Sequence, residues 1–302
     1  MHIKKIYEKL IEKISPERIM QDEPMCKHTS FKIGGPVDIM VLPHSVEEVQ
    51  HVVRLCREMK IDYDIMGNGS NLLVADKGIQ GVIIKIGDNF KRVDIEGEKV
   101  TAQAGILLST LANLIVKESL QGFEFASGIP GTLGGALAMN AGAYGGEMKD
   151  VVIGASVVDD RGNVVYLTNE ELELEYRSSI VQKKGFIVLE VEMKFEKGDR
   201  EVIREKIKDF TQRRTTKQPL QLPSAGSTFK RPPNHFAGKL IEDAGLKGVR
   251  VGGAQVSDLH AGFIVNVDHA TAEDVINLIK LVQKTVRDKF GVELHPEVKI
   301  ME

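Results

Sequence analysis

Glycine is concentrated in one short stretch of the 302-residue chain. Residues 127–146, SGIPGTLGGALAMNAGAYGG, contain seven of its 29 glycines. Glycine lets the main chain approach a ligand closely, and successive free N–H groups before a helix bind anions, so this stretch favours a pyrophosphate site. Tight turns between short strands are the alternative. Such turns do not require the small residues Ala136, Ala138 and Ala141 that accompany the glycines.

A second glycine loop, GNGSNL at residues 67–72, follows an expected strand at 64–66. It lacks the third glycine of a dinucleotide fingerprint, and residues 72–75 continue as an expected strand rather than a helix, which disfavours a Rossmann site. Alone, the hexapeptide is typical of a polar turn. Together with the first stretch, it is predicted to form the second half of one dinucleotide cradle. Gly238-Lys239 is followed by leucine, which excludes a Walker A loop.

Basic residues gather between Thr211 and Arg250, where eight of them stand against two acidic residues, although the whole chain has a net charge of −3. A local excess of cations suits a small, multiply charged anion, and a solvated basic face is the alternative. Few aromatic residues are interleaved with these cations. The pattern therefore does not indicate nucleic-acid binding.

Within this basic segment, small residues flank Ser227 in the sequence SAGSTFK at 224–230 and leave its hydroxyl accessible. No G-x-S-x-G motif surrounds Ser227, which argues against a hydrolase nucleophile and leaves a turn-forming serine as the alternative. The histidines of this half show no metal-ligand spacing, so no metal site is predicted and each alone is more typical of a structural residue. These histidines are His235, His260, His269 and His295.

Composition indicates a folded, intracellular protein. The chain is 42% hydrophobic and 27% charged, which excludes disorder. Its two cysteines, Cys26 and Cys56, lack ligand spacing and are expected to be reduced, buried or partly buried thiols. No signal peptide or membrane-spanning stretch is expected, so the predicted location is the cytoplasm.

Apolar spacing predicts a mixed α+β fold in three consecutive lobes, residues 1–87, 88–198 and 199–302. Helices are expected at 4–14, 45–60, 107–118, 199–210 and 271–290, with Ser45 followed by Glu48, and Thr271 followed by Asp274, as the caps of the second and the last. Strands are expected at 37–42, 64–66, 72–75, 82–86, 100–104, 151–159, 164–167, 187–195, 262–267 and 298–301.

Six segments together resemble the UDP-N-acetylenolpyruvoylglucosamine reductases, the family known as MurB. They occur in family order over nearly the whole chain. The glycine motifs are shared with other flavoproteins of the vanillyl-alcohol-oxidase type, whereas the last three segments together are specific. The segments are TSFKIGG at 29–35, GNGSNL at 67–72, GIPGTLGGALAMNAGAYG at 128–145, YRSS at 176–179, AGSTFKRP at 225–232 and HPEVKI at 295–300.

The resemblance implies an α+β flavoprotein with a two-part FAD-binding domain of the vanillyl-alcohol-oxidase (PCMH) type and a C-terminal α+β substrate domain. FAD would be bound non-covalently and reduced by NADPH. The enzyme would then reduce UDP-N-acetylglucosamine enolpyruvate to UDP-N-acetylmuramate, with ping-pong kinetics. This reaction serves peptidoglycan synthesis, and through it cell shape and division. No nucleic-acid partner or membrane insertion is implied, and the oligomeric state is left open.

The resemblance also implies roles for individual residues. Arg177 and protonated Glu297 would stabilise the enolate formed from the substrate, and Ser227 would protonate it. FAD would contact Asn68, Gly69, Ser70, Asn71, Ile129, Pro130, Gly131, Thr132, Gly134, Gly135, Asn140, Ala141, Gly142 and Ile187. The substrate would contact Arg214, Lys217, Lys230, Arg231 and His260.

Two further points stay open at the level of sequence. The short interval between Arg177 and Ser227 resembles the family variant that lacks a tyrosine-bearing loop, so the residue that closes over the substrate is not identified. An FAD oxidase of the same superfamily and a non-catalytic UDP-sugar or nucleotide sensor are the competing functions.

Overall fold

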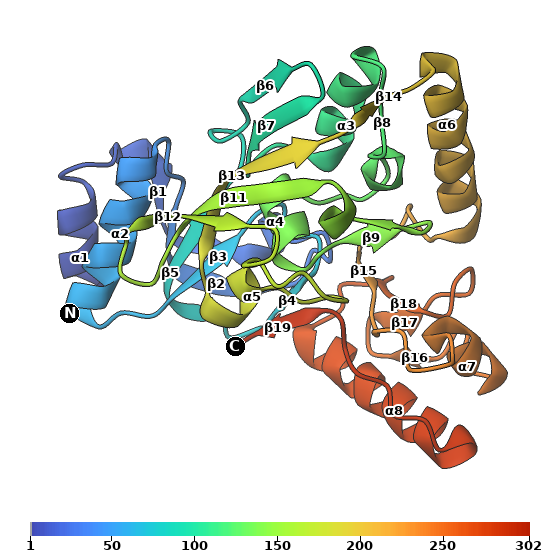
Figure 1. The fold of residues 1–302 in the computed structure, drawn as a ribbon. Helices are drawn as coiled ribbons and strands as arrows, with labels where there is room; N and C mark the ends of the chain where they lie inside the picture. Colours follow the sequence, from blue (N-terminus) through green and yellow to red (C-terminus); the bar gives the residue numbers. More distant parts are fainter. Residues whose placement is uncertain (1) are drawn as a thin grey trace. The chain divides into compact units, whose positions relative to one another are not determined.

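The computed structural model describes residues 2–302 and divides them into two compact units (Figure 1). Unit 1 contains the chain up to Asp22, Asp38–Asn68 and Gln80–Arg213, and unit 2 contains Glu23–Val37, Gly69–Ile79 and Arg214–Glu302. Each unit is therefore assembled from separate stretches of chain. The division into three consecutive lobes stays a prediction.

One sheet of unit 1 has the strand order β1-β2-β5-β3, and β3 runs parallel to β5. Helices α1 and α2 pack against each other beside this sheet (Figure 1). The Ser45 hydroxyl caps α2 by accepting from the Glu48 N–H, as the sequence predicts. The bounds are α1 His2–Leu10, β1 Ile19–Pro24, β2 Pro36–Val41, α2 Val46–Met59, β3 Tyr63–Met66 and β5 Ile79–Lys85.

The second sheet of unit 1 is antiparallel, in the order β12-β11-β13-β7-β6, and α4 packs on β13 and β7. The short pairs β9–β10 and β8–β14 flank it. The bounds are β6 Val93–Glu96, β7 Lys99–Gln103, α3 Leu108–Lys117, β8 Leu120–Gln121, α4 Leu133–Ala138, β9 Gly142–Ala143, β10 Gly146–Glu147, β11 Val152–Val158, β12 Val164–Thr168, α5 Ile180–Lys184, β13 Ile187–Lys194, β14 Glu196–Lys197 and α6 Arg200–Lys217.

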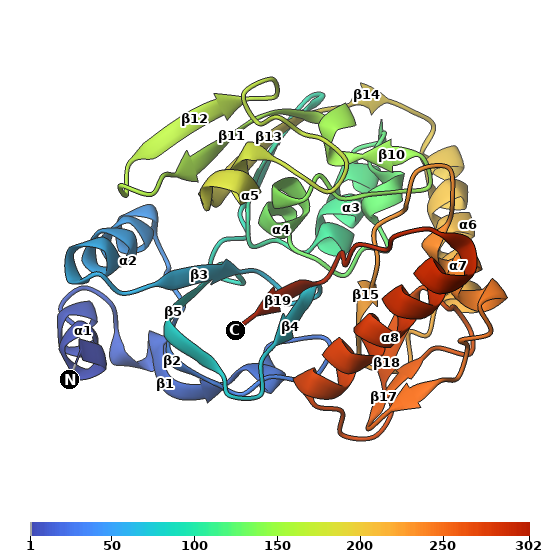
Figure 2. The same ribbon diagram turned by 90° about the horizontal axis from the view of Figure 1, so that it is seen from below.

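Unit 2 has its own apolar core, in which Phe31, Leu73 and Phe229 come from three distant stretches of chain. Its sheet has the order β15-β18-β17-β16, with α8 packed against β17 (Figure 2). A separate parallel pair joins β4 to β19. The bounds are β4 Leu72–Val74, β15 Ser224–Ser227, α7 Ala237–Asp243, β16 Arg250–Val251, β17 Ala254–Val256, β18 Phe263–Asn266, α8 Ala272–Phe290 and β19 Lys299–Met301.

Four single turns of 3₁₀-helix complete the described elements. They are Pro16–Arg18, Met25–Lys27, Glu124–Ala126 and Met148–Asp150.

The predicted α+β class is confirmed, and so is the capping box that starts α8 at Thr271 and Asp274. The prediction was wrong at two helix ends. The first helix stops at Leu10, and the helix expected at 199–210 continues to Lys217, so that Arg214 and Lys217 are helical. Cys56 is buried and Cys26 partly buried, as expected; burial raises the pKa of the Cys56 thiol to about 12, which leaves it unreactive.

Within residues 2–302, no helix combines the length and the apolar composition that crossing a membrane requires. The same residues contain no group of three or more His, Cys, Asp or Glu side chains that could hold a metal ion.

Candidate functional site

The two glycine loops contact each other in unit 1. The Asn68 side chain donates a hydrogen bond to the Pro130 carbonyl over 2.6 Å. A Cβ atom added to Gly67 would lie 2.2 Å from the Thr132 hydroxyl oxygen, so only glycine fits there. The Thr132 hydroxyl is itself occupied, because it accepts from the Gly135 N–H and caps α4. The two loops are thus in contact at these residues, and their role as one dinucleotide cradle stays a prediction.

The joined loops offer unused main-chain donors. Leu133 and Gly134 donate to the carbonyls of Ile106 and Ala104, over 2.9 and 2.8 Å. The preceding N–H groups, at residues 131 and 132, make no hydrogen bond to any described residue. Two adjacent free N–H groups are a donor set that fits a phosphate oxygen, so this loop suits the pyrophosphate of a dinucleotide.

The rest of the second glycine loop belongs to unit 2, where Ser30 fixes it. The Ser30 N–H donates to the Gly69 carbonyl over 3.1 Å, and the Ser30 hydroxyl donates to the Ser224 carbonyl over 2.6 Å. The main chain at Gly69 lies close to that of His28, since a Cβ added to Gly69 would lie 2.1 Å from the His28 carbonyl oxygen. The TSFKIGG segment thus ties the loop to β15.

Two of the predicted catalytic residues lie on neighbouring segments of unit 2. The Glu297 N–H donates to the Thr228 carbonyl over 2.8 Å, and Thr228 directly follows Ser227. Asn71 holds the same segment, because its side chain donates to the Glu297 carbonyl over 3.1 Å. Ser227 is exposed and Glu297 is half-buried, so both can be reached from solvent.

Arg177, the third predicted catalytic residue, lies in unit 1 beside the glycine-rich stretch. Its guanidinium lies 3.5 Å from the Gly142 carbonyl oxygen and 5.2 Å from the centre of the Tyr176 ring. Its φ of 55° lies in the left-handed region, which is uncommon for a residue other than glycine. Such strain is concentrated at functional sites.

The basic segment of unit 2 is partly neutralised. Lys239 pairs with Asp243 and Lys247 pairs with Glu242, which uses both acidic residues of the segment. Arg231 stacks over the Phe236 ring, 4.1 Å from its centre. Lys217 ends α6 and is exposed. The substrate-binding prediction for Arg214, Lys217, Lys230, Arg231 and His260 stays a prediction.

His260 is a neutral hydrogen-bond donor. Its Nδ1 accepts from the Gly262 N–H over 3.0 Å, and its ring packs edge-on against Phe263. Burial lowers the pKa of His260, which favours the uncharged ring. Because Nδ1 is the acceptor, the single proton of the neutral ring is on Nε2.

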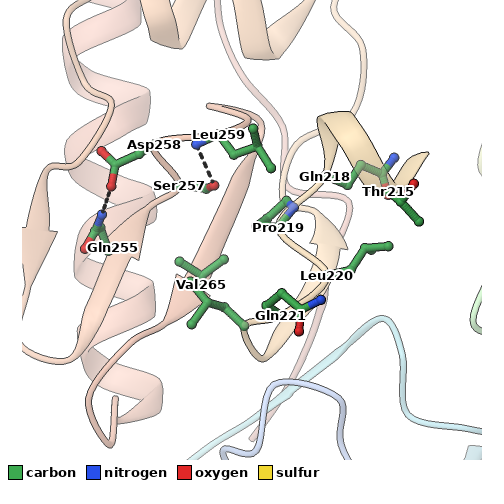
Figure 3. Close-up of a pocket in the computed structure, with 11 residues that line it drawn as sticks. Thr215, Gln218, Pro219, Leu220, Gln221, Gln255, Ser257, Asp258, Leu259 and Val265 are labelled. Carbon is green, nitrogen blue, oxygen red and sulfur yellow. Dashed lines mark hydrogen bonds between the residues drawn. The ribbon is translucent and has the colours of Figure 1, made fainter. Parts of the chain in front are cut away.

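A pocket of about 320 Å³ in unit 2 was not predicted from the sequence (Figure 3). The side-chain oxygen of Gln218 is buried and has no hydrogen-bond partner among the described residues. Two lining residues are sequence neighbours of predicted substrate residues, because Gln218 follows Lys217 and Leu259 precedes His260. This adjacency is the one sequence signal that pointed to the pocket. The lining residues are Thr215, Gln218, Pro219, Leu220, Gln221, Leu222, Gln255, Ser257, Asp258, Leu259 and Val265.

Two family models match the chain. The C-terminal domain of UDP-N-acetylenolpyruvoylglucosamine reductase matches residues 218–301, and an FAD binding domain matches residues 37–168. A UDP-N-acetylenolpyruvoylglucosamine reductase of Alkaliphilus oremlandii is 59% identical over 297 residues, which cover 98% of each chain. The reductase of Clostridioides difficile is 52% identical over 301 residues, 100% of this chain and 99% of that one.

Solved structures agree with these matches. The reductase of Thermus caldophilus superposes with a TM-score of 0.81 at 34% identity and covers 94% of this chain and 99% of that one. The glucose dehydrogenase Phl p 4 superposes with a TM-score of 0.52 at 16% identity over 65% of this chain and 44% of its own, and shows the fold alone.

We expect Gly67→Ala to weaken the binding of FAD. The added methyl group collides with the Thr132 hydroxyl and separates the two loops. The Kd for FAD, measured by titrating the apoprotein with FAD, should rise at least about tenfold, which corresponds to roughly 1.4 kcal/mol of binding free energy. Gly87→Ala is the matched control, because no atom lies within 4 Å of its added Cβ. An equal Kd for FAD in both variants would contradict the contact between the loops.

His260 should make the protein sensitive to acid. Its pKa is lower in the folded protein than in the unfolded chain, so below about pH 6.5 the unfolded chain gains a proton that the folded protein resists. Stability is therefore lost as the pH falls through the unfolded value. We compare the urea midpoint of His260→Asn with that of wild type at pH 5 and at pH 8. The midpoint of the variant relative to wild type should be higher at pH 5 than at pH 8. A difference that is independent of pH would contradict the neutral ring.

Proposed function

The chain belongs to the UDP-N-acetylenolpyruvoylglucosamine reductase family, and on that premise we propose how its own residues perform the reaction. It is an FAD-dependent oxidoreductase that uses NADPH to reduce UDP-N-acetylglucosamine enolpyruvate in peptidoglycan synthesis. We propose in addition that it acts in the cytoplasm, where NADPH and nucleotide sugars are available. Its product would then support cell shape and cell division.

FAD, when bound, supplies the hydride that originates from NADPH and reaches the enolpyruvyl methylene carbon of the substrate. The free N–H groups at residues 131 and 132 would hold its pyrophosphate, and the loop at 68–71 would contribute further donors. These contacts would be made by the main chain, which fits the glycines and other small residues of the two loops.

The chain must then stabilise and protonate a negative charge. Addition at the methylene carbon moves the double-bond electrons onto the neighbouring carbon and its carboxylate. Arg177 would face that carboxylate, and protonated Glu297 would donate a hydrogen bond to the enolate. The Ser227 hydroxyl would give its proton to the carbon. The observation that best supports this assignment is the hydrogen bond from Glu297 to Thr228, beside an exposed Ser227.

The substrate's diphosphate and nucleoside need separate contacts. Exposed cations such as Lys217 and Arg231, and the Nε2–H of His260, suit the diphosphate. The pocket beside Gln218 lies within the size range of small-ligand pockets, which begins near 300 Å³. The buried oxygen of the Gln218 carboxamide is out of reach of a ligand, and its nitrogen would donate to a carbonyl of uracil. We assign the pocket to the nucleoside.

An anaerobic two-step experiment tests the function. NADPH should bleach the yellow protein under argon, and the enolpyruvyl UDP-sugar should restore the colour without oxygen. If air reoxidised the bleached protein rapidly and the UDP-sugar did not, the protein would be an oxidase. A colourless protein that binds the UDP-sugar would be a sensor.

Ser227→Ala should separate the two steps. Bleaching by NADPH needs no proton from Ser227, so its rate should match wild type, whereas reoxidation by the UDP-sugar should slow by a factor of about 10² to 10⁴. Stopped-flow flavin absorbance measures both rates. Ser224→Ala, a serine three residues earlier in β15, should behave as wild type in both. Equal slowing of both steps by Ser227→Ala would contradict its role as proton donor.

Gln218→Met should weaken binding of the UDP-sugar alone. The substitution keeps the side chain's length but removes the amide, and the loss of about 1.4 kcal/mol of hydrogen bonding should raise KM for the UDP-sugar roughly tenfold. The rate of bleaching by NADPH should not change. Stability should hold or rise, because a buried oxygen without a partner is removed. Gln80→Met, at an exposed residue of β5, is the control, and an equal KM in both variants would exclude the assignment of the pocket.

A further inference from the structure

A two-residue hairpin of unit 1 presents Arg177. Glu175 and Ser178 close the hairpin by exchanging main-chain hydrogen bonds of 3.0 and 3.1 Å. Tyr176 and Arg177 form its tip. The left-handed φ of Arg177 is a backbone conformation that a residue other than glycine rarely adopts. A turn with such backbone strain keeps its shape only if its surroundings hold it.

Two buried polar side chains attach the base of this hairpin to the end of α4. The Asn140 side-chain nitrogen donates to the Glu175 carbonyl over 3.2 Å. On the other side, the Ser179 hydroxyl donates to the Ala138 carbonyl over 2.6 Å. Asn140 and Ser179 are each 0% exposed. Both hydrogen bonds join residues 138–140 of the glycine-rich stretch to the hairpin.

The amide of Asn140 is used at both ends. Its oxygen accepts from the Lys149 N–H over 2.9 Å, while its nitrogen donates to the hairpin. Its φ of 42° is also left-handed, a conformation that asparagine tolerates better than most residues. Glycine would tolerate this φ still better but has no amide to donate. The residue type therefore matches a position that needs both the backbone conformation and the donor.

We propose that Asn140 and Ser179 are positioning residues that fix the Arg177 hairpin against the glycine-rich stretch, so that the guanidinium is aligned for the substrate carboxylate before substrate binds. The proposal rests on the proposed function, because it acts through Arg177. It gives Asn140 a role other than the cofactor contact expected from the sequence, which stays a prediction. Charge stabilisation by a preorganised cation loses much of its effect when the cation is displaced by about 1 Å.

The test uses the FAD-loaded protein and Asn140→Asp. Aspartate keeps the size of the side chain and tolerates the left-handed backbone, but it replaces the donor to Glu175 by an acceptor. Because Asn140 is also an expected FAD contact, its variant is reloaded with FAD and judged by the ratio of the two rates, whereas Ser179→Ala should match wild type in flavin content and in the rate of bleaching by NADPH. Reoxidation by the enolpyruvyl UDP-sugar should slow about 10- to 100-fold at saturating substrate, with little change in KM.

A double-mutant test with Arg177→Ala distinguishes a positioning role of Asn140 from a general structural role. In an Arg177→Ala background, Asn140→Asp should cause no further slowing, because the group that it positions is gone. Asn169→Asp is the matched control. The Asn169 side chain also bridges main-chain carbonyls, those of Lys149 and Val152, but no hydrogen bond connects it to the hairpin. It should change thermal stability without selectively slowing reoxidation.

Ser179→Ala provides a second variant if Asn140→Asp does not fold, and it should give the same selective slowing. The proposal is overturned if the Asn140 and Ser179 variants behave as Asn169→Asp, if Ser179→Ala loses flavin, or if both variants slow the two steps equally or slow reoxidation further in the Arg177→Ala background. Failure of the wild-type protein to be reoxidised by the UDP-sugar would instead overturn the proposed function, together with this inference.

Discussion

The candidate site of unit 2 depends on one short run of main-chain hydrogen bonds near the end of the chain. Glu297 donates to the Thr228 carbonyl and Lys230 donates to the His295 carbonyl, each over 2.8 Å. Immediately afterwards, β19 pairs with β4, and Lys299 donates to the Asn71 carbonyl. Three stretches that are far apart in the sequence are thereby aligned in one register. A shift by one residue would turn the Glu297 side chain to the opposite face.

The glycines serve the packing of the protein as much as the approach of a ligand. Gly134 lies against Ala104 and Gly146 against the Phe125 ring, where an added Cβ would lie within 2.9 and 2.7 Å. The density of glycine in residues 127–146 predicts a ligand at this stretch. The structure shows that several of these residues are small because another part of unit 1 contacts them. The two explanations are compatible for one loop, since the N–H groups at 131 and 132 make no hydrogen bond to any of the residues 2–302.

Long elements whose apolar residues recur at regular spacing could be predicted from sequence, whereas short elements could not. Helix α8 has six buried apolar residues at helical spacing and a capping box, and its predicted bounds differ from the observed ones by one residue. Helix α4 has six residues and contains two glycines, so neither length nor propensity identified it. The discontinuous units could not be predicted, because they depend on contacts such as Ser30 to Ser224, 194 residues apart.

The residues of the candidate site also fall into those that the sequence identifies and those that only the fold reveals. Arg177, Ser227 and Glu297 were assigned because motifs identify them, and their catalytic roles stay predictions. For the Gln218 pocket the sequence offered only the neighbouring residues Lys217 and His260, and for the link from Asn140 to Glu175 it offered nothing, since a buried amide and an exposed one look alike in a sequence. What distinguishes Asn140 is the geometry of its two hydrogen bonds, which exists only once residues 138–149 and 175–179 are folded together.

The donors proposed for the two ligands differ in kind, and this difference fits the reaction cycle. FAD stays bound, so uncharged main-chain N–H groups fixed in a packed loop can hold its pyrophosphate without adjusting at each turnover. NADPH and the UDP-sugar must enter and leave. Exposed cations such as Lys217 and Arg231 attract an incoming anion over a distance and are screened by water, so they speed association more than they strengthen binding. A neutral His260 would add a directional hydrogen bond without a further charge to retain the product.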